Sequence, residues 1–152
     1  MSALKIINLS DRPEFKEQVT DWLWQAFGSE NSRDFFASVV QSSLSGADLP
    51  QTFIALEGDT LAGTVGLWRC DLISRQDLTP WLAALYVDEE FRSQGLGQQL
   101  QAFVLEQSRR SGFREVYLYA EFTGYYERFG WQYIGDALDY PDKPVHLFRQ
   151  FL

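Results

Sequence analysis

The chain has 152 residues, of which 45% are hydrophobic and 16% aromatic, so it can bury the core of one domain and is not disordered. Its formal net charge of −8 argues against nucleic-acid binding, because such binding depends on neutralising phosphate charges. No apolar run is long enough to cross a membrane, no signal peptide is evident, and the lone Cys70 can form no internal disulfide, so we expect one cytoplasmic domain over residues 1–152.

The first half of the chain predicts a strand, two amphipathic helices and a β-hairpin. Asp11 and Glu14 resemble a capping box before the first helix. Gly58-Asp59 separates two β-rich runs, which is typical of a hairpin turn. In chain order, the predicted elements are a strand at 4–9, helices at 15–27 and 32–45, and strands at 52–56 and 61–70.

The second half alternates strands and helices. In chain order, we expect a strand at 81–87, a helix from 97 to 112, a strand at 116–120, a short helix at 124–129, and strands near 131–134 and 145–151. The whole order is βααβββαβαββ. This order predicts an α/β fold of the α+β type, with a mixed sheet and helices packed on its faces.

The most informative segment is the turn that follows the predicted strand at 81–87. It reads Arg92-x-x-Gly95-x-Gly97 and opens an amphipathic helix. Unpaired N–H groups and the positive end of the helix dipole suit a phosphate, and the two glycines let a diphosphate approach the backbone. No Lys follows Gly97 as in a Walker loop, and Leu100 stands where a dinucleotide fingerprint has its third glycine. The alternative is an ordinary turn whose glycines serve geometry alone.

A second motif lies further along the chain, at Tyr125-Tyr126-Glu127-Arg128-Phe129-Gly130-Trp131. A strand ending in Tyr86-Val87, the turn from Arg92 to Gly97 and this aromatic segment follow one another at a spacing that resembles the GNAT superfamily of acyl-CoA-dependent N-acetyltransferases. The resemblance implies a central mixed sheet of about seven strands flanked by about four helices. It also implies that the cofactor lies in a gap between two splayed central strands.

By this resemblance the cosubstrate is acetyl-CoA, with no metal. A backbone N–H of the strand ending at Val87 would stabilise the oxyanion of a tetrahedral intermediate. Tyr126 would be the catalytic acid that protonates the departing thiolate, and its alternative role is a core aromatic. The residues implied in cofactor binding are Leu85, Tyr86, Val87, Arg92, Ser93, Gln94, Gly95, Leu96, Gly97 and Gln98. For Arg92, a role in shaping the turn and a solvated ion pair with Glu89 or Glu90 are alternatives to a phosphate contact.

The general base is left open by the sequence. Relatives often carry a Glu in the strand of the first motif, but here that strand begins Trp81-Leu82-Ala83-Ala84 and offers no carboxylate. The candidates are Asp71, Glu121, His146 or a water molecule.

The expected partner is the amine of a small molecule or a peptide, and not nucleic acid or a membrane. The resemblance places the acceptor near the first two helices and two loops, where Trp24 is a stronger surface candidate than Trp22, which fits the buried stripe. Two alternative hypotheses are a non-catalytic acyl-CoA-binding module and a plain nucleotide-binding domain. The sequence does not decide the acceptor, the acyl-chain preference, or whether the protein is a homodimer.

Overall fold

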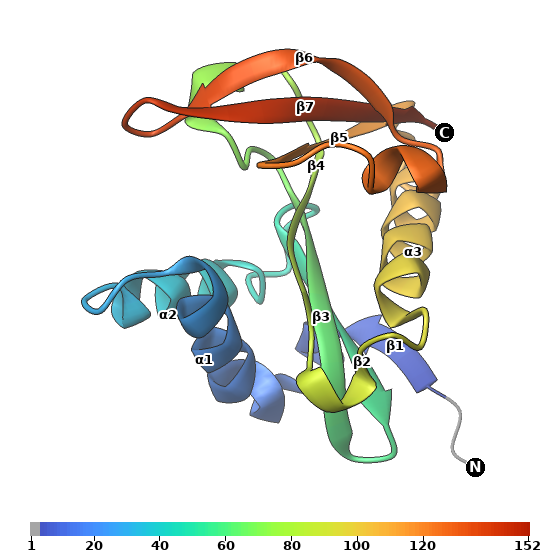
Figure 1. The fold of residues 1–152 in the computed structure, drawn as a ribbon. Helices are drawn as coiled ribbons and strands as arrows, with labels where there is room; N and C mark the ends of the chain where they lie inside the picture. Colours follow the sequence, from blue (N-terminus) through green and yellow to red (C-terminus); the bar gives the residue numbers. More distant parts are fainter. Residues whose placement is uncertain (1–3) are drawn as a thin grey trace. The chain divides into compact units, whose positions relative to one another are not determined.

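The computed structural model describes residues 4–152 and contains one mixed sheet in the strand order β1-β2-β3-β4-β5-β7-β6 (Figure 1). The elements are β1 (Leu4–Asn8), α1 (Lys16–Phe27), α2 (Arg33–Ser42), β2 (Gln51–Glu57), β3 (Thr60–Trp68), β4 (Trp81–Val87), α3 (Leu96–Arg110), β5 (Glu115–Ala120), β6 (Gln132–Asp139) and β7 (Lys143–Phe151). The predicted fold class is confirmed, as is the order of the seven strands and the three longer helices within residues 4–152. The chain groups into two compact units, residues 4–66 with 84–103 and residues 67–83 with 104–152.

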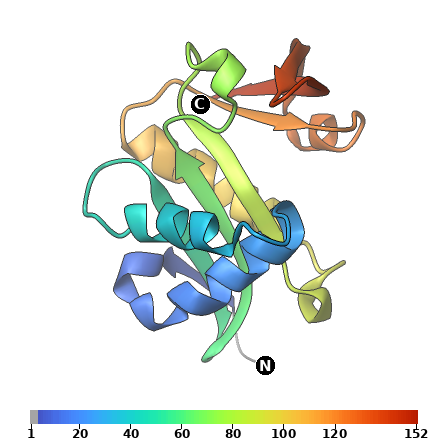
Figure 2. The ribbon, with the colours of Figure 1, turned by 90° about the vertical axis from the view of Figure 1, so that its left-hand side faces the viewer.

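In the first unit, β2 separates two packing layers because its side chains alternate between the faces of the sheet. Ile54 and Leu56 join the apolar cluster formed with α1 and α2, whereas Phe53 contacts Phe103 of α3 at 5.0 Å between ring centroids. Figure 2 shows α1 and α2 lying across β2 and β3. The buried members of the α1–α2 layer are Leu9, Val19, Trp22, Leu23, Phe36, Val40, Ile54, Leu56 and Leu61.

The start of α1 differs from the predicted capping box. Two short 3₁₀ turns, Leu9–Asp11 and Pro13–Phe15, precede α1. The carboxylate of Glu14 accepts a hydrogen bond from Arg12 Nε at 2.7 Å, so it is engaged in an ion pair instead of closing the box. The helix therefore begins without a side-chain cap at Phe15.

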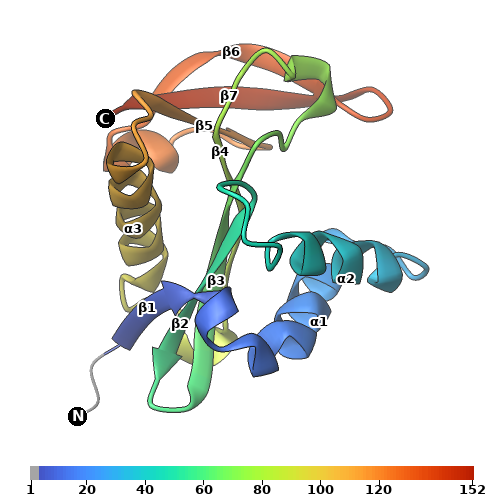
Figure 3. The same cartoon turned by 180° about the vertical axis from the view of Figure 1, so that it is seen from behind.

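In the second unit, β5, β7 and β6 form an antiparallel ladder, and Figure 3 shows β6 and β7 side by side, joined by a turn. The register pairs Ala120 with His146 and Asp136 with His146. Strand β4 runs parallel to β5, with Trp81 opposite Tyr117. On one face of this ladder, Tyr117, Val145 and Leu147 form an apolar cluster with Trp81 of β4 and with Leu72 of the connection after β3.

The predicted short helix at 124–129 is a 3₁₀ helix, η5 (Tyr126–Phe129), so residues 4–152 contain three α-helices where about four were expected. The carboxylate of Glu127 accepts the N–H of Gly124 at 2.9 Å, and Gly130, with φ +93°, ends the turn. Four residues are too few to complete an α-helix, and short 3₁₀ turns are common in this situation. No helix among residues 4–152 has the length and apolar character needed to cross a bilayer.

Candidate functional site

The turn between β4 and α3 leaves main-chain N–H groups exposed. Residues 92–95 are exposed, and the N–H of Gln99 donates to the carbonyl of Gly95 at 3.1 Å as the first bond of α3. Because residues 96–98 precede Gln99, their amides have no acceptor within the helix. Gly95 has φ +80°, and a Cβ there would meet no atom within 4 Å. The turn therefore offers open space and free donors at the positive end of a helix dipole, as a diphosphate requires.

Arg92 shapes this turn. Its Nε donates to the carbonyl of Val87 at 3.0 Å, and its guanidinium carbon lies 5.6 Å from the ring centroid of Tyr86. Ser93, next along, has φ +63°, a conformation that residues other than glycine seldom adopt. The bonds of Arg92 are thus to the end of β4, which favours the turn-shaping alternative over the ion pair with Glu89 or Glu90.

Gly63 of β3 allows α3 to pack closely beside this turn. A Cβ at Gly63 would lie 3.0 Å from the carbonyl oxygen of Tyr86 and 3.1 Å from Leu100 Cδ1. In a dinucleotide-binding fold the helix itself supplies the small residue for this approach. Here the strand supplies it, and Leu100 is fully buried in its place. A glycine inside a strand often marks a close approach, so the sequence held this signal although it was not used.

Strand β4 changes conformation at Ala84, which has φ +52°. A positive φ in an alanine is uncommon and redirects the N–H and C=O groups that follow it. Leu85, Tyr86 and Val87 come after this point and are half-buried, whereas Trp81, Leu82 and Ala83 are buried. The predicted backbone site is therefore on the more accessible half of β4. The sequence Trp81-Leu82-Ala83-Ala84 gives no signal that Ala84 adopts a positive φ.

Tyr126, the first residue of η5, lies in an aromatic cluster of the second unit. Its ring stacks on Phe122 with an interplanar angle of 9° and lies 6.0 Å from Phe148. Burial, and then the neighbouring Tyr125, raise the pKa of Tyr126 to about 12. Its hydroxyl donates no hydrogen bond to any residue between 4 and 152 in the structure. Tyr126 is thus a protonated phenol with a free donor, while Tyr125 packs against Phe129 and Arg128.

Two of the three candidate bases already have partners. His146 Nδ1 lies 2.7 Å from Asp136 Oδ1, and Tyr133 donates its hydroxyl to the same oxygen at 2.7 Å. The hydrogen bond from Tyr133, followed by that from His146, lowers the pKa of Asp136. Glu121 forms an ion pair with Lys143.

Asp71, the third candidate, lies in the connection after β3. The residue keeps some accessible surface, but its carboxyl group lies deep among protein atoms. Burial, and then the charge of Asp139, raise the pKa of Asp71 to about 8. Asp71 therefore differs from Glu121 and His146, because it has no ion-pair partner among residues 4–152 and its pKa is raised. The nearby Asp139 and Tyr119 were not candidates, because no local pattern connects them with Asp71.

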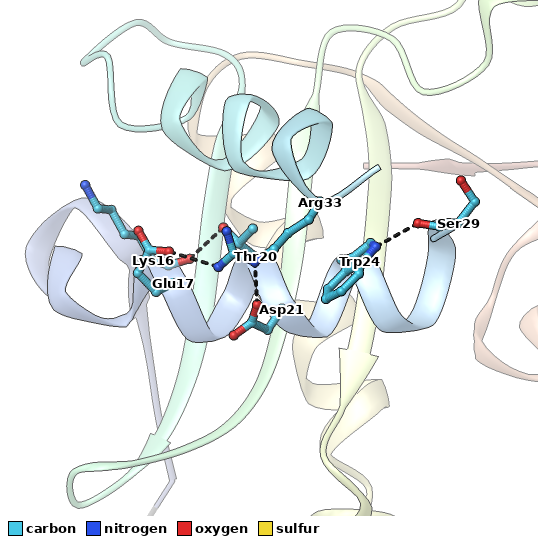
Figure 4. A network of polar contacts seen from close by, with 7 residues as sticks. All are labelled: Lys16, Glu17, Thr20, Asp21, Trp24, Ser29 and Arg33. Atoms are coloured by element: carbon cyan, nitrogen blue, oxygen red, sulfur yellow. Dashed lines mark hydrogen bonds and ion pairs between the residues drawn. The ribbon is translucent and has the colours of Figure 1, made fainter. Parts of the chain in front are cut away.

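The first two helices line a cavity of about 500 Å³ within the first unit. Lys16, Glu17 and Thr20 of α1 are among its lining residues. Figure 4 shows how the two helices are held together: Arg33 of α2 donates to Asp21 at 2.8 Å and to Glu17 at 3.0 Å.

The two tryptophans considered for the acceptor site, Trp22 and Trp24, differ in burial. Trp22 is buried, as predicted, and Trp24 is half-buried with its indole N–H bonded to the carbonyl of Ser29 at 2.7 Å. Trp81 is fully buried and donates to the carbonyl of Leu78 at 2.6 Å. Among residues 4–152, no three or more His, Cys, Asp or Glu side chains gather as a metal site.

The sequence model of the acetyltransferase (GNAT) family matches residues 16–131. No curated protein matches the chain by sequence.

Several solved structures share the fold. Aminoglycoside 6′-acetyltransferase type Ii is 20% identical with a TM-score of 0.75, over 98% of this chain and 96% of that one. An acetyltransferase from Streptococcus agalactiae is 19% identical with a TM-score of 0.74, over the full length of both. A GNAT family acetyltransferase from Elizabethkingia anophelis, solved with acetyl-CoA bound, is 16% identical with a TM-score of 0.69, over 98% of each chain. At these identities the likeness shows the fold.

Proposed function

The chain belongs to the GNAT acetyltransferase family, and we propose that it transfers the acetyl group of acetyl-CoA to an amine of a small molecule or peptide. Membership makes it an acetyl-CoA-dependent acyltransferase. The observation that carries the finer proposal is the exposed turn before α3, with its free amides and the open space at Gly95.

The main chain of this turn is proposed to hold the diphosphate of coenzyme A. The donors are the amides of residues 94–98, aided by the side chains of Ser93 and Gln98, while Arg92 keeps the turn in shape through Val87. Backbone donors suit a polyanion in this acidic protein, because they carry no charge that neighbouring carboxylates could neutralise.

The half of β4 that follows Ala84 is proposed to stabilise the reacting carbonyl. A fixed N–H in Leu85, Tyr86 or Val87 would donate to the oxyanion, which gains most from donors that are already oriented. The conformation of Ala84 supports this role, since backbone outliers cluster where a group must be aimed.

Tyr126 is proposed to protonate the departing thiolate. Because burial raises its pKa to about 12, the phenol keeps its proton throughout the neutral range. Its hydroxyl, which is not used by any neighbour between residues 4 and 152, can then donate to sulfur.

The proposal is tested first by calorimetry with acetyl-CoA, CoA and NAD, and then by thiol release from acetyl-CoA in the presence of amines. We expect acetyl-CoA and CoA to bind and NAD to fail, since the third position of the dinucleotide fingerprint is Leu100. Tyr126→Phe should lower kcat by about 100-fold and leave the Kd of acetyl-CoA unchanged, as expected for loss of a general acid. Tyr125→Phe is the matched control and should retain activity, because Tyr125 only packs.

A non-catalytic acyl-CoA-binding module is the second candidate, and one observation favours it. The first three residues of β4, Trp81, Leu82 and Ala83, are buried and include no carboxylate to act as a base. This module would bind acetyl-CoA but release no thiol with any amine, and Tyr126→Phe would change nothing.

A further inference from the structure

Asp71 carries a deeply placed carboxyl group for which the structure gives no partner. No hydrogen bond or ion pair links it to any residue between 4 and 152, although the residue keeps some accessible surface. Removing an ionised carboxylate from water without a compensating cation is strongly unfavourable. Such a group either holds a proton or receives a positively charged ligand.

A second carboxylate is held beside it. Ser74, three residues after Asp71, donates its hydroxyl to the carbonyl of Leu138 at 2.6 Å, which ties this connection to the end of β6. Asp139 follows directly, and its charge acts on Asp71. Asp139 accepts the N–H of Tyr140 at 3.0 Å, and neither carboxylate has a cationic partner among residues 4–152. We refer to Asp71 and Asp139 as the acidic pair.

The acidic pair lies beside the apolar face of the β5-β7-β6 ladder. Asp139 pairs with Lys143, and Ala137 with Val145, so Asp139 projects to the same face as Val145. The phenol of Tyr119 belongs to that face, and burial, followed by the charges of Asp71, Asp139 and Glu121, raises its pKa above the usual range. Tyr126 contacts Phe148, whose side chain alternates to the opposite face.

We propose that Asp71 is the catalytic residue that receives the ammonium group of the acceptor amine and takes its proton. This inference rests on the proposed acetyl transfer and names the base that the reaction needs. The unpartnered carboxylate attracts a cation, and the charge of Asp139 strengthens that attraction.

The proton and electron count closes with these groups. The Asp71 carboxylate accepts one proton from R–NH₃⁺, and the freed lone pair of nitrogen forms the C–N bond to the thioester carbon. The carbonyl π pair moves to oxygen and returns as the C–S bond breaks, and the sulfur leaves with the bonding pair. Tyr126 gives its proton to that sulfur and regains one from the nitrogen, which becomes the amide. Asp71 then returns its proton to solvent.

Other groups near Asp71 are less suited to this role. Glu121 already forms an ion pair with Lys143, and Tyr119 stays protonated because its pKa is raised. His146 is already paired with Asp136, whose Oδ1 lies 2.7 Å from its Nδ1. A divalent metal is a poorer occupant than an ammonium, because no third ligating side chain joins the pair within the described chain, residues 4–152.

The test uses the full-length protein saturated with CoA, which lacks an acetyl group to transfer. Benzylamine, spermidine and kanamycin are titrated by calorimetry at about pH 8.5, where Asp71 is largely ionised and the amines are largely protonated. At least one amine should bind, and Asp71→Asn should weaken it by about tenfold or more. Asp77→Asn, in the same connection but exposed and paired with Arg75, is the matched control and should bind normally.

Turnover with the bound amine completes the test. Asp71→Asn should lower kcat by about 100-fold while the Kd of acetyl-CoA is unchanged. Asp139→Asn leaves Asp71 in place and should weaken amine binding less, which keeps the test valid if Asp71→Asn fails to fold.

The inference is overturned if no amine binds the wild-type protein, or if Asp71→Asn keeps wild-type kcat and amine affinity. If acetyl-CoA binds and thiol is released normally by Asp71→Asn, this inference alone fails. If wild-type protein does not bind acetyl-CoA, the proposed function fails first.

Discussion

The turn before α3 and the acidic pair differ in how they would bind a charged ligand. The turn offers uncharged main-chain donors in residues 94–98, fixed by the start of a helix and by the bond of Arg92 to Val87. The acidic pair offers carboxyl groups, and the charge on Asp71 depends on its burial and on the neighbouring Asp139. In the proposed reaction the first meets an anion and the second a cation.

This difference has consequences for pH and for stability. Backbone amides do not titrate, so the turn should hold a diphosphate equally well across the neutral range. The pKa of Asp71 is raised to about 8, so any function of this carboxyl group should follow pH. A protein with a net charge of −8 can therefore bind a polyanion through one region and a cation through the other.

The largest expected effect comes from placing a carboxylate in the turn. Gly95→Glu adds charge repulsion and backbone strain where φ is +80°, and should weaken acetyl-CoA binding by about 100-fold or more, as measured by calorimetry. Gly112→Glu is the matched control: it has φ +89° and equally open surroundings after the other end of α3. Equal losses of affinity in both variants would contradict a diphosphate site at the turn.

The next effect concerns the pH dependence of turnover. For wild type, kcat/KM should rise about tenfold per pH unit on the acid side and level off near pH 8, because Asp71 must be ionised to accept a proton. Asp139→Asn removes the charge that raises the pKa of Asp71, and so should move this limb to lower pH. The Kd of acetyl-CoA should be flat over the same range. A limb that does not move in Asp139→Asn would count against the acidic pair.

A smaller effect is expected on stability, with a sign opposite to that on activity. Below about pH 4, Asp71 is protonated in both the folded and the unfolded chain. Between about pH 4 and about pH 8, only the folded chain keeps this proton. The free energy of unfolding therefore falls as the pH rises through this range, by up to about 1.4 kcal/mol per pH unit.

Asp71→Asn removes this loss and should therefore raise the unfolding temperature at pH 8 by a few degrees or more, and much less at pH 4. Thermal unfolding at the two pH values measures the difference, with Asp77→Asn as the control. A variant that is destabilised more at pH 8 than at pH 4 would show that Asp71 has a cationic partner in the folded protein.

The smallest effect is expected at His146. Its imidazole is already paired with Asp136, so His146→Gln should change kcat by less than about threefold. Steady-state thiol release measures this. A loss comparable with that of Asp71→Asn would transfer the role of base to His146.

Much of the fold could be predicted from periodicity and turn residues. The strand at Trp81–Val87 has the predicted bounds, and Gly58, with φ +62°, forms the expected hairpin turn. The capping box at Asp11 and Glu14 failed because Arg12 lies between them and takes the carboxylate of Glu14. A local motif therefore predicts structure well only where no neighbouring side chain competes for the same hydrogen bond.

The residues of the candidate site divide in the same way. The turn residues 92–98 follow from sequence because a strand, a glycine turn and a helix create unpaired amides wherever they occur in that order. The preference for Asp71 over Glu121 and His146 could not follow, since it depends on Lys143 and Asp136, which are 22 and 10 residues away from their partners.

By itself, the sequence determined the order of the elements, the glycine turn before α3 and the family of the chain, because these depend on bonds between near neighbours. Only the tertiary structure decided the positive φ of Ala84, the burial of Tyr126 and the position of Asp139 beside Asp71. The charge state of a carboxyl group depends on the atoms and charges that packing brings around it, and packing joins residues that are distant in the chain.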